Sequence, residues 1–465
     1  MTRLFHKYYP VRGMIFFLIE GGLIFSGVWL LIWLNLSGVQ YYDPAGITVW
    51  IKILFITVIV QTSLYYHNLY DFSSKTGFSA LILHIIQATG IACLVLAAFY
   101  YFLPQLILER GFFLVVLFLM FLVLVSWRLL YQYVCQQQLW NERILLVGDG
   151  RLAGMIGNEI SNNMDSGYTV KAIFSNPGNT GLAEKLGVEK SDNYDGLCEY
   201  ALNNGIRKIV VALEERRGHS PVRALLHCKM QGLKILEGAS FYEALSGKIL
   251  AGSITPSWLV FSDGFRRNRI KIVAKRCFDI LFSLSGIILS APLQIIVAIL
   301  IKTTSSGPVF FKQTRVGQME KKFDVIKFRT MHDNAENESG AVWAEKNDVR
   351  ITPVGRIFRK LRLDELPQFW NVLKGEMSFV GPRPERPVFV EQLKKVIPYY
   401  GERHTVKPGI TGWAQVNYGY GASEDDALRK LEYDLFYIKH LSLVFDLYIV
   451  LKTIKTVLFG GSLSR

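Results

Sequence analysis

The sequence is poor in cysteine, with only five among its 465 residues. These are Cys93, Cys135, Cys198, Cys228 and Cys277. Their spacing matches neither the regular pairs of a disulfide framework nor the close pairs that bind zinc. The sequence therefore gives no reason to expect a cross-linked secreted domain or a cysteine-based metal site, and we expect free, reduced thiols.

Acidic residues are scarce relative to basic ones: 38 Asp and Glu stand against 52 Lys and Arg, which leaves a net charge of +14. Such an excess is typical of proteins that lie against anionic lipid, handle anionic substrates or bind nucleic acid. We find no nucleic-acid-binding motif, and the basic residues cluster beside apolar runs. We therefore expect a lipid bilayer and anionic substrates as partners, and no nucleic acid.

Hydrophobic residues make up 51% of the chain, and its mean hydropathy of +0.25 is too high for an ordinary soluble protein. Four apolar runs, at residues 11–36, 47–66, 78–103 and 112–134, account for the excess. Each is close to the roughly 20 residues that a helix needs to cross a bilayer. The pattern predicts a multi-pass anchor of four transmembrane helices within residues 1–138.

The basic residues around the first run indicate its orientation. Arg3, His6, Lys7 and Arg12 precede it or lie at its start, whereas the connection at 36–49 holds no Lys or Arg. Cytoplasmic segments carry the excess of Lys and Arg, so the N-terminus is expected in the cytoplasm, and an even number of crossings returns the chain there. The run lacks a small-residue cleavage site and is too long for a signal-peptide core, so we interpret it as an anchor.

A fifth apolar run, at residues 280–301, has Lys and Arg clusters on both sides. Positive charge on both flanks indicates that both ends face the cytoplasm. Ser290 and Pro292 lie at its midpoint, where proline removes a helix hydrogen bond and a serine hydroxyl can satisfy the freed backbone. We predict a re-entrant helix near 273–302 that is broken at these residues. The alternative on hydropathy alone is a kinked spanning helix.

Between residues 139 and 263 strand patterns alternate with helix patterns. A buried strand at 143–148 leads into a G-x-G-x-x-A turn formed by Gly148, Gly150 and Ala153. Further strands are expected at 170–175 and 208–213, and a helix at 221–231. The pattern predicts a small Rossmann-like α/β module.

Nucleotide binding by this module would require an acidic residue about 20 residues after the glycine turn, to hold a ribose. The chain has Phe174, Ser175 and Asn176 there. We therefore favour a non-catalytic structural or regulatory module, with nucleotide binding as the alternative.

Two adjacent acids, Asp364 and Glu365, precede apolar residues at 366, 369, 370 and 373. That spacing predicts a helix with one buried face, opened by the two acids, with Pro367 in its first turn and Gly375 as its stop. The acids would then cap free backbone donors. The same helix terminus also attracts phosphate, so local sequence leaves a helix cap and a phosphate-handling site both open.

Basic residues recur after the fifth apolar run. The strand pattern at 325–329 places Lys327 and Arg329 on one face. Arg383 stands between Pro382 and Pro384, where a stiff backbone allows its guanidinium to grip phosphate oxygens. A solvated basic face and a simple proline turn are the respective alternatives.

From Lys275 to the C-terminus, the chain resembles the catalytic domain of the bacterial phosphoglycosyl transferases that carry a re-entrant membrane helix. The resemblance rests on ordered blocks at 275–279, 307–309, 327–331, 363–365, 371–375, 379–384 and 408–416. With the four helices and the α/β module, the chain resembles the large members, the polyprenyl-phosphate hexose-1-phosphate transferases that begin exopolysaccharide, capsule and O-antigen assembly. The expected domains are 1–138, 139–263 and 264–465, the last a mixed α/β catalytic domain.

The resemblance implies an enzyme that transfers a hexose 1-phosphate from a UDP-hexose to undecaprenyl phosphate and releases UMP. Asp364 matches the family nucleophile, which forms an aspartyl-phosphosugar intermediate. Glu365 matches its partner carboxylate, and both acids would bind the Mg²⁺ cofactor. Arg359 and Arg383 would hold phosphates. The weaker candidates for substrate contact are Lys327, Arg329 and Lys407.

The resemblance also implies a bacterial inner-membrane protein with a cytoplasmic catalytic domain, and a homodimer, while the identity of the hexose stays open. Many members carry an arginine after the 414–417 block, where this chain has Tyr418 and Gly419. The break in the membrane helix is Ser-Ala-Pro instead of Ser-Pro, so the bend is expected to be offset. The segment 433–458 is consistent with a helix on the membrane surface or with a core helix.

Two other functions compete with this one. A membrane-anchored nucleotide-sugar dehydratase or epimerase would need a second nucleotide-binding domain and a Tyr-x-x-x-Lys pair, for which the chain offers only Tyr448 and Lys452 in an apolar segment. A non-enzymatic assembly scaffold would not need the acid pair or Arg383. Both alternatives are therefore weaker than the transferase.

Overall fold

The computed structural model describes fifteen stretches of the chain. They are residues 3–4, 7–8, 11–33, 49–70, 77–107, 113–137, 141–163, 166–175, 181–213, 221–253, 264–265, 269–332, 350–419, 421 and 423–459. The chain forms two compact units, Met1–Ser246 and Gly247–Arg465. The predicted boundaries at 138/139 and 263/264 stay predictions.

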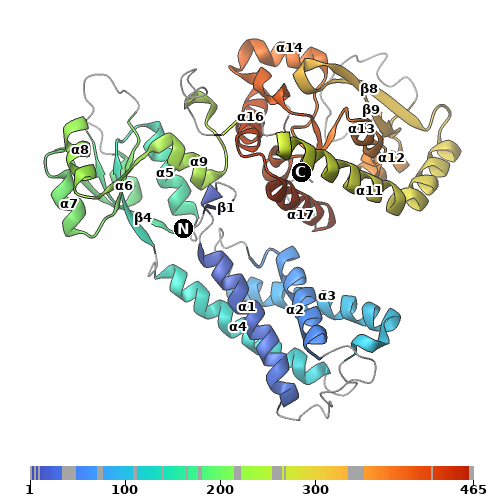
Figure 1. The fold of residues 1–465 in the computed structure, drawn as a ribbon, viewed down its shortest axis with the longest axis horizontal. Coiled ribbons are helices and arrows are strands. Elements are labelled where there is room, and N and C mark those ends of the chain that lie inside the picture. The colour runs from blue at the N-terminus through green and yellow to red at the C-terminus, as the bar shows by residue number, and fades with distance from the viewer. Residues whose placement is uncertain are drawn as a thin grey trace. The chain divides into compact units, whose positions relative to one another are not determined.

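Four long apolar helices dominate the first part of unit 1 (Figure 1). They are α1 (Val11–Trp33), α2 (Val49–Tyr66), α3 (Phe78–Phe102) and α4 (Phe113–Gln136), and a short helix η1 (Pro104–Leu106) follows α3. Their bounds agree with the four predicted apolar runs. Among the described residues, α2, α3 and Leu117–Cys135 of α4 are long and apolar enough to cross a membrane, whereas the apolar part of α1 is the shorter Ile15–Leu30. Two-residue strands β1 (Arg3–Leu4) and β2 (Lys7–Tyr8) precede α1.

One buried ion pair joins the first and last of these helices. Glu20 of α1 and Arg128 of α4 lie 2.8 Å apart, with side chains 0% and 2% exposed. Arg128 also donates to the Leu69 carbonyl oxygen and lies over the Phe16 ring. Because a charge in an apolar bundle is costly without a partner, this contact fixes how α1 packs on α4.

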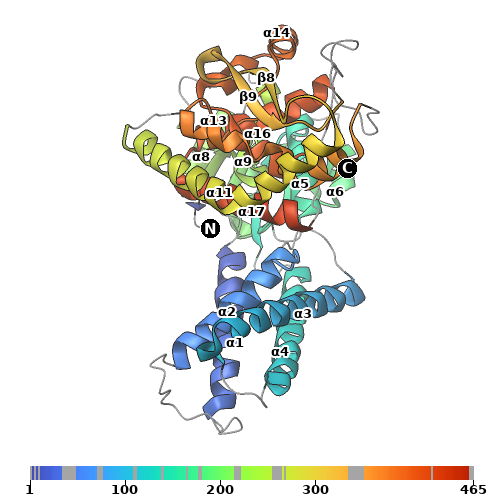
Figure 2. The ribbon, with the colours of Figure 1, turned by 90° about the vertical axis from the view of Figure 1, so that its right-hand side faces the viewer.

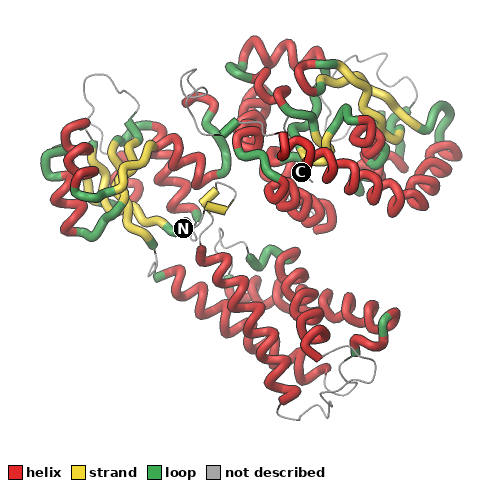
Figure 3. The backbone as a smooth tube through the Cα atoms, viewed as in Figure 1, coloured by secondary structure: helices red, strands yellow, loops and turns green. Residues whose placement is uncertain are grey.

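The second part of unit 1 is an α/β region around a five-stranded parallel sheet (Figure 3). Its strands are β3 (Glu142–Val147), β4 (Tyr168–Phe174), β5 (Glu189–Ser191), β6 (Lys208–Val211) and β7 (Lys234–Glu237), in the order β5-β4-β3-β6-β7. The helices are α5 (Arg151–Asn162), α6 (Gly181–Leu186), α7 (Leu197–Asn203), α8 (Val222–Met230) and α9 (Gly238–Ser246). Parallel neighbours require such crossover connections, and the predicted strands and the predicted helix at 221–231 are confirmed.

The glycine turn after β3 has a steric cause. Gly148 has φ +115°, and a Cβ atom there would lie 2.6 Å from the Ala212 carbonyl oxygen. Glycine is therefore required by backbone conformation and by close approach to the end of β6. Of the three residues at the position where a ribose-binding acid is expected, Phe174 ends β4 and Ser175 is buried, while Asn176 lies outside the described residues.

Unit 2 opens with the 3₁₀ turn η2 (Ala251–Ser253) and the long helix α11 (Arg269–Thr304). An antiparallel hairpin of β8 (Phe310–Val316) and β9 (Lys322–Phe328) follows, with η3 (Gln318–Glu320) at its turn. Then come α12 (Pro353–Lys360), η4 (Leu363–Glu365), α13 (Gln368–Lys374), β10 (Ser378–Val380), α14 (Pro387–Val396), η5 (Tyr400–Thr405), β11 (Gly409–Thr411), α15 (Trp413–Asn417), α16 (Glu424–Lys439) and α17 (Leu443–Phe459). Strands β10 and β11 form a second, parallel pair.

The fifth apolar run is not divided into two helices as predicted. It lies within one helix, α11, which extends from Arg269 to Thr304 and contains Pro292. Ser290 Oγ donates to the Gly286 carbonyl oxygen at 2.5 Å and accepts from Gln294 Nε2 at 2.8 Å. A serine hydroxyl that bonds the carbonyl four residues back bends a helix, as proline does, so both residues favour a change of direction here. The helix changes direction along its length instead of separating in two (Figure 2). It is long and apolar enough to cross a membrane.

Polar side chains tie the start of α11 to the rest of unit 2. Lys275 Nζ lies 2.7 Å from Asp446 Oδ2 on α17. Asp279 Oδ1 accepts from Ser378 Oγ and from the Phe379 backbone N–H, both at 2.9 Å. These buried bonds position the apolar helix against β10 and α17.

The segment 433–458 is two helices, because α16 ends at Lys439 and α17 begins at Leu443. One side of α17 buries Phe445 and Ile449, while Val444 and Leu447 are exposed. The helix is therefore part of the core and also presents apolar side chains to the outside.

Candidate active site

The two acids lie on a 3₁₀ turn and not at the start of a helix. Arg362, in the left-handed conformation with φ 57°, precedes η4, and α13 begins only at Gln368. The predicted helix start at Asp364 is wrong because i to i+3 bonds, such as the Leu366 N–H to the Leu363 carbonyl oxygen at 3.3 Å, form the turn instead. The predicted stop at Gly375 is confirmed, with φ +87°.

Asp364 and Glu365 are equally buried, each 8% exposed, but their surroundings differ. Glu365 Oε1 lies 2.8 Å from Arg383 Nη2 and 3.6 Å from Lys327 Nζ, and Glu365 Oε2 lies 3.3 Å from Arg362 Nη1. Asp364 has no hydrogen bond or ion pair with any residue that the structure describes. One acid is held by three cations, and its neighbour is left free to react or bind.

The electrostatics of the two acids follow from these contacts. Burial raises the pKa of Asp364, and the charge of Glu365 raises it further, while Lys327, Arg359 and Arg362 act in the opposite direction. Burial also raises the pKa of Glu365, but Arg383, Lys327 and Arg362 outweigh it and hold that pKa well below the usual range. Glu365 therefore stays ionised more readily than Asp364 does.

Lys327 and Arg329, which were predicted on one strand face, have different partners. Lys327 of β9 faces Glu365, and burial lowers its pKa while Glu365 opposes that effect. Arg329 lies just beyond β9 and donates through Nη2 to the carbonyl oxygen and Oγ of Ser305, at 3.1 and 2.8 Å. The structure thus brings Lys327 to the acids and connects Arg329 to the end of α11.

Arg359 and Lys407 complete the set of predicted substrate contacts. Arg359 lies in the last turn of α12 and donates through Nε to Thr330 Oγ1 at 2.8 Å, close enough to Asp364 to act on its pKa. Burial, then the charge of Arg276, lowers the pKa of Lys407. No described contact brings Lys407 to the acid pair, so its role stays a prediction.

Arg383 reaches Glu365 from a tightly packed turn after β10. A Cβ atom on Gly381 would lie 2.4 Å from the Lys407 carbonyl oxygen. Glycine therefore allows this turn to pack against the segment before β11, and the flanking prolines stiffen it. The sequence prediction that Arg383 has a rigid support agrees with this geometry.

Sequence reasoning missed Arg362 as a member of the site. Its side chain contacts Glu365, and its backbone is left-handed. This backbone conformation depends on the folded turn and is not indicated by the sequence. Its position three residues before Glu365 was the one available signal.

The described residues offer few carboxylate ligands for a metal ion such as Mg²⁺. Among the residues that the structure describes, no group of three or more His, Cys, Asp or Glu side chains could hold a metal. Mg²⁺ is usually held by one or two carboxylates together with substrate phosphates and water. The unpaired carboxylate of Asp364 fits such a site, whereas Glu365 is already occupied by three cations.

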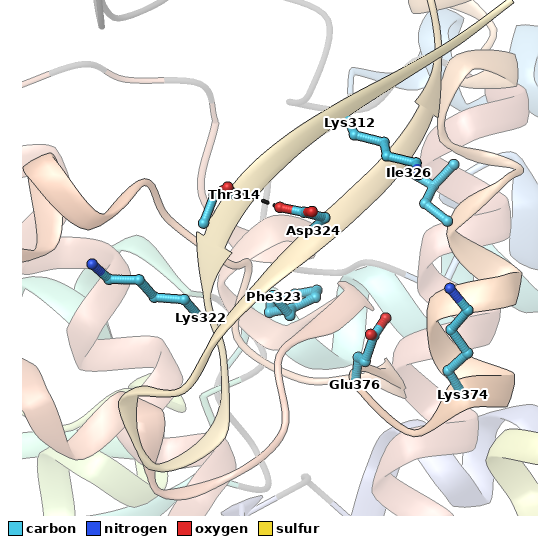
Figure 4. Close-up of a pocket in the computed structure, with 8 residues that line it drawn as sticks. All are labelled: Lys312, Thr314, Lys322, Phe323, Asp324, Ile326, Lys374 and Glu376. Carbon is cyan, nitrogen blue, oxygen red and sulfur yellow. Dashed lines mark hydrogen bonds between the residues drawn. The ribbon is translucent and has the colours of Figure 1, made fainter.

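A cavity of about 410 Å³ lies beside the β8–β9 hairpin (Figure 4). Its lining residues are Lys312, Thr314, Lys322, Phe323, Asp324, Ile326, Lys374 and Glu376. None of the predicted site residues lines this cavity. Successive side chains of a strand point to opposite faces, so Asp324 and Ile326 lie on the face of β9 opposite to Lys327. The cavity is therefore separate from the acid pair.

Comparison with known proteins gives two family models. The bacterial sugar transferase model matches residues 270–460, and the CoA-binding domain model matches residues 67–235. The first match contains both acids and the cations around them.

Three relatives show the extent of similarity. The chain is 44% identical over 238 residues to a UDP-N-acetylgalactosamine-undecaprenyl-phosphate N-acetylgalactosaminephosphotransferase of Aeromonas hydrophila, covering 51% of this chain and 55% of that protein. It is 47% identical over 191 residues to a UDP-glucose:undecaprenyl-phosphate glucose-1-phosphate transferase of Klebsiella pneumoniae, covering 40% of each. A protein of the same name from Escherichia coli (strain K12) is 33% identical over 326 residues, 68% of each chain.

Proposed function

The chain belongs to the bacterial sugar transferase family, and we propose that it transfers a hexose 1-phosphate from a UDP-hexose to undecaprenyl phosphate and releases UMP. This would be the first membrane step in making an exopolysaccharide, capsule or O-antigen. The observation that carries the proposal is the acid pair, in which Glu365 gathers three cations beside an unpaired Asp364. Such a site can bring two anionic substrates together and present a nucleophile to one of them.

In the first step, an Asp364 carboxylate oxygen attacks the phosphorus that carries the sugar. A bond forms between the Asp364 oxygen and this phosphorus. The bond from the phosphorus to the oxygen that bridges the two phosphates breaks, and UMP leaves with the bridging oxygen. In the second step, a phosphate oxygen of undecaprenyl phosphate attacks the same phosphorus and releases Asp364. The buried state of Asp364 suits this role, since no donor among the described residues competes for its oxygens.

The cations around Glu365 would receive the substrate phosphates. Arg383 and Lys327 already lie beside Glu365, which holds them in place before substrate enters. In the described parts of the chain, Arg359 is held by a hydrogen bond from Nε, which leaves its two Nη groups to bind phosphate oxygens. Arg329 and Lys407 are proposed as outer contacts.

Mg²⁺ is proposed to bind at Asp364 with the substrate phosphates, with Glu365 at most a secondary ligand. When bound, it would reduce the repulsion between the anionic substrates. The chain's own contribution is to hold Asp364 free and the three cations beside it.

The membrane arrangement is proposed from charge and length. We propose that α11 enters and leaves the cytoplasmic side of a bacterial inner membrane, because Lys and Arg flank it on both sides, it contains Pro292 and it changes direction along its length. The helices α1 to α4 would anchor the chain, and the catalytic domain would face the cytoplasm, where UDP-sugars occur. A homodimer remains a prediction.

The α/β region is proposed to be a Rossmann-like module. Counted along this region, its strand order is 3-2-1-4-5, the order of doubly wound folds. We propose a structural or regulatory role for it, since a fold alone does not establish binding.

The contacts of Lys452 argue against a dehydratase or epimerase, which would need this lysine for its Tyr-x-x-x-Lys pair. Lys452 Nζ donates to Asn417 Oδ1 at 2.6 Å and lies 5.1 Å from the centre of the Trp413 ring. It is thus engaged in packing α17 on α15 and not paired with a nucleotide fingerprint.

The test is a UMP-release assay with purified full-length protein, undecaprenyl phosphate, Mg²⁺ and a panel of UDP-hexoses. We expect UMP release with at least one hexose and a lipid-linked product of matching mass. Absence of release with every UDP-hexose would refute the proposed transfer and favour the scaffold.

A further inference from the structure

The turn that carries Arg383 is bound along its backbone by neighbouring residues. The Val380 carbonyl oxygen accepts from Lys275 Nζ and Tyr437 OH, both at 3.0 Å. The Pro382 carbonyl oxygen accepts from the Gly409 N–H at 2.9 Å. The backbone before Arg383 is therefore fixed by hydrogen bonds to Val380 and Pro382. The carbonyl group of Arg383 itself is fixed by a different residue.

Arg403 supplies that contact. Its Nη2 donates to the Arg383 carbonyl oxygen at 3.1 Å and to Asp434 Oδ2 at 2.8 Å, and its Nη1 donates to Tyr400 OH at 2.5 Å. Arg403 is only 6% exposed and Asp434 only 1%. A planar guanidinium presents its donors in a fixed fork, so these three acceptors together set its orientation as well as its position.

The burial of this arginine calls for an explanation. Placing a charged pair in the interior is costly in solvation, and it stabilises a fold weakly compared with apolar packing. The pair here connects α16, η5 and the Arg383 turn, and Arg403 has no contact with Asp364 or Glu365 among the described residues. Its geometry thus acts on the site only through the backbone of Arg383.

We propose that Arg403, held by Asp434, is a positioning residue that sets where the guanidinium of Arg383 meets Glu365 and the incoming diphosphate. The proposal rests on the proposed function in that Arg383 is taken to bind substrate phosphate. The Arg383 side chain begins one atom from the carbonyl group that Arg403 fixes. A shift of this backbone therefore moves the phosphate-binding group directly, and small displacements of binding groups are costly.

The test is a double-mutant cycle on UDP binding, measured by isothermal titration calorimetry with full-length protein in detergent. The variants are Arg403→Lys, Arg383→Ala and the two combined. We expect each single change to raise the dissociation constant of UDP about tenfold, and the combination to match Arg383→Ala within about twofold. Arg403 would then act only through Arg383.

Independent losses that multiply in the combined variant would overturn the proposal, because they indicate a general structural role. Unchanged UDP binding in Arg403→Lys would also overturn it. The matched control is Lys394→Ala, which removes an exposed ion pair with Glu320 (2.7 Å) beside η5 that has no described hydrogen bond to Arg403 or Arg383, and it should bind UDP normally.

If Arg403→Lys does not fold, Tyr400→Phe replaces it in the cycle, since it removes one acceptor of Arg403 and leaves the charge pair intact. Its smaller loss of UDP affinity is expected to vanish in the Arg383→Ala background, and persistence of the loss would contradict the proposal. UDP binding does not require turnover. The cycle can therefore fail while UMP release succeeds, and the reverse.

Discussion

Arg383 Nη2 lies 2.8 Å from Glu365 Oε1, and this contact joins the proline-flanked turn after β10 to the 3₁₀ turn that carries both acids. The ion pair is partly exposed on the arginine side, at 38%, and almost closed on the carboxylate side, at 10%. Glu365 is thus fixed by a cation that substrate can still reach. Asp364, one residue away, has no hydrogen bond or ion pair within the part of the chain that the structure describes.

Glu365→Gln should impair the site more than the fold. Removal of the charge leaves Arg383, Lys327 and Arg362 beside one another without their common partner, so they are expected to separate. Because the three cations are partly exposed, the loss of stability should be about 1 kcal/mol, while UMP release should fall at least tenfold. Thermal unfolding in detergent and the UMP assay measure the two effects, and full turnover in this variant would argue against a role for Glu365.

Gly381→Ala should displace the Arg383 turn. Its Cβ atom would lie 2.4 Å from the Lys407 carbonyl oxygen, a distance that forces backbone movement. We expect a loss of about 1–3 kcal/mol in the free energy of unfolding together with weaker UDP binding. Gly401→Ala is the control, since the nearest atom to its Cβ would be 3.5 Å away. Equal behaviour of the two variants would contradict the close packing described for Gly381.

His404 should make stability depend on pH. Burial, followed by the charge of Arg403, lowers the pKa of His404 to about 4. The unfolded chain takes up this proton near pH 6.5 and the folded chain only near pH 4, so stability is lost as pH falls. Between pH 7 and pH 5 the loss from this group should be about 2 kcal/mol.

His404→Gln should remove that component, so that thermal unfolding changes less between the two pH values than in the wild type. His332→Gln is the control, because His332 is exposed. An unchanged pH dependence in His404→Gln would show that folding does not lower the pKa of His404.

The Glu20 and Arg128 pair should be essential to the anchor. Arg128→Met alone leaves a buried carboxylate between α1 and α4 without its partner, and we expect a loss of about 3–5 kcal/mol in detergent. Glu20→Gln combined with Arg128→Met removes both charges and should recover most of that loss. Thermal unfolding measures the series, and a stable single variant would contradict the importance of the pair.

Much of the fold is readable from the sequence because its signals are local. A helix that crosses a bilayer needs a long apolar run, and the predicted runs agree with α1 to α4 within a few residues. The parallel strands are likewise marked by short apolar stretches between helix patterns. Gly375 ends α13 as expected, because a left-handed residue there favours glycine.

The acid turn and its supports were less readable. Apolar residues at 366, 369, 370 and 373 predict a helix, but they do not distinguish a helix start at Asp364 from a 3₁₀ turn before Pro367. Arg403 and Asp434 are 31 residues apart and meet only through the packing of η5 on α16. Pairings of this kind depend on tertiary structure, so no local pattern indicates them.

The covalent role of Asp364 is tested most directly by intact-protein mass spectrometry after incubation with the UDP-hexose that supports turnover, without undecaprenyl phosphate. We predict a mass increase equal to one hexose phosphate, located at Asp364 by peptide analysis and lost when undecaprenyl phosphate is added. Asp364→Asn should show no mass increase and no UMP release. Full turnover by Asp364→Asn, or a hexose phosphate attached at another residue, would contradict the account.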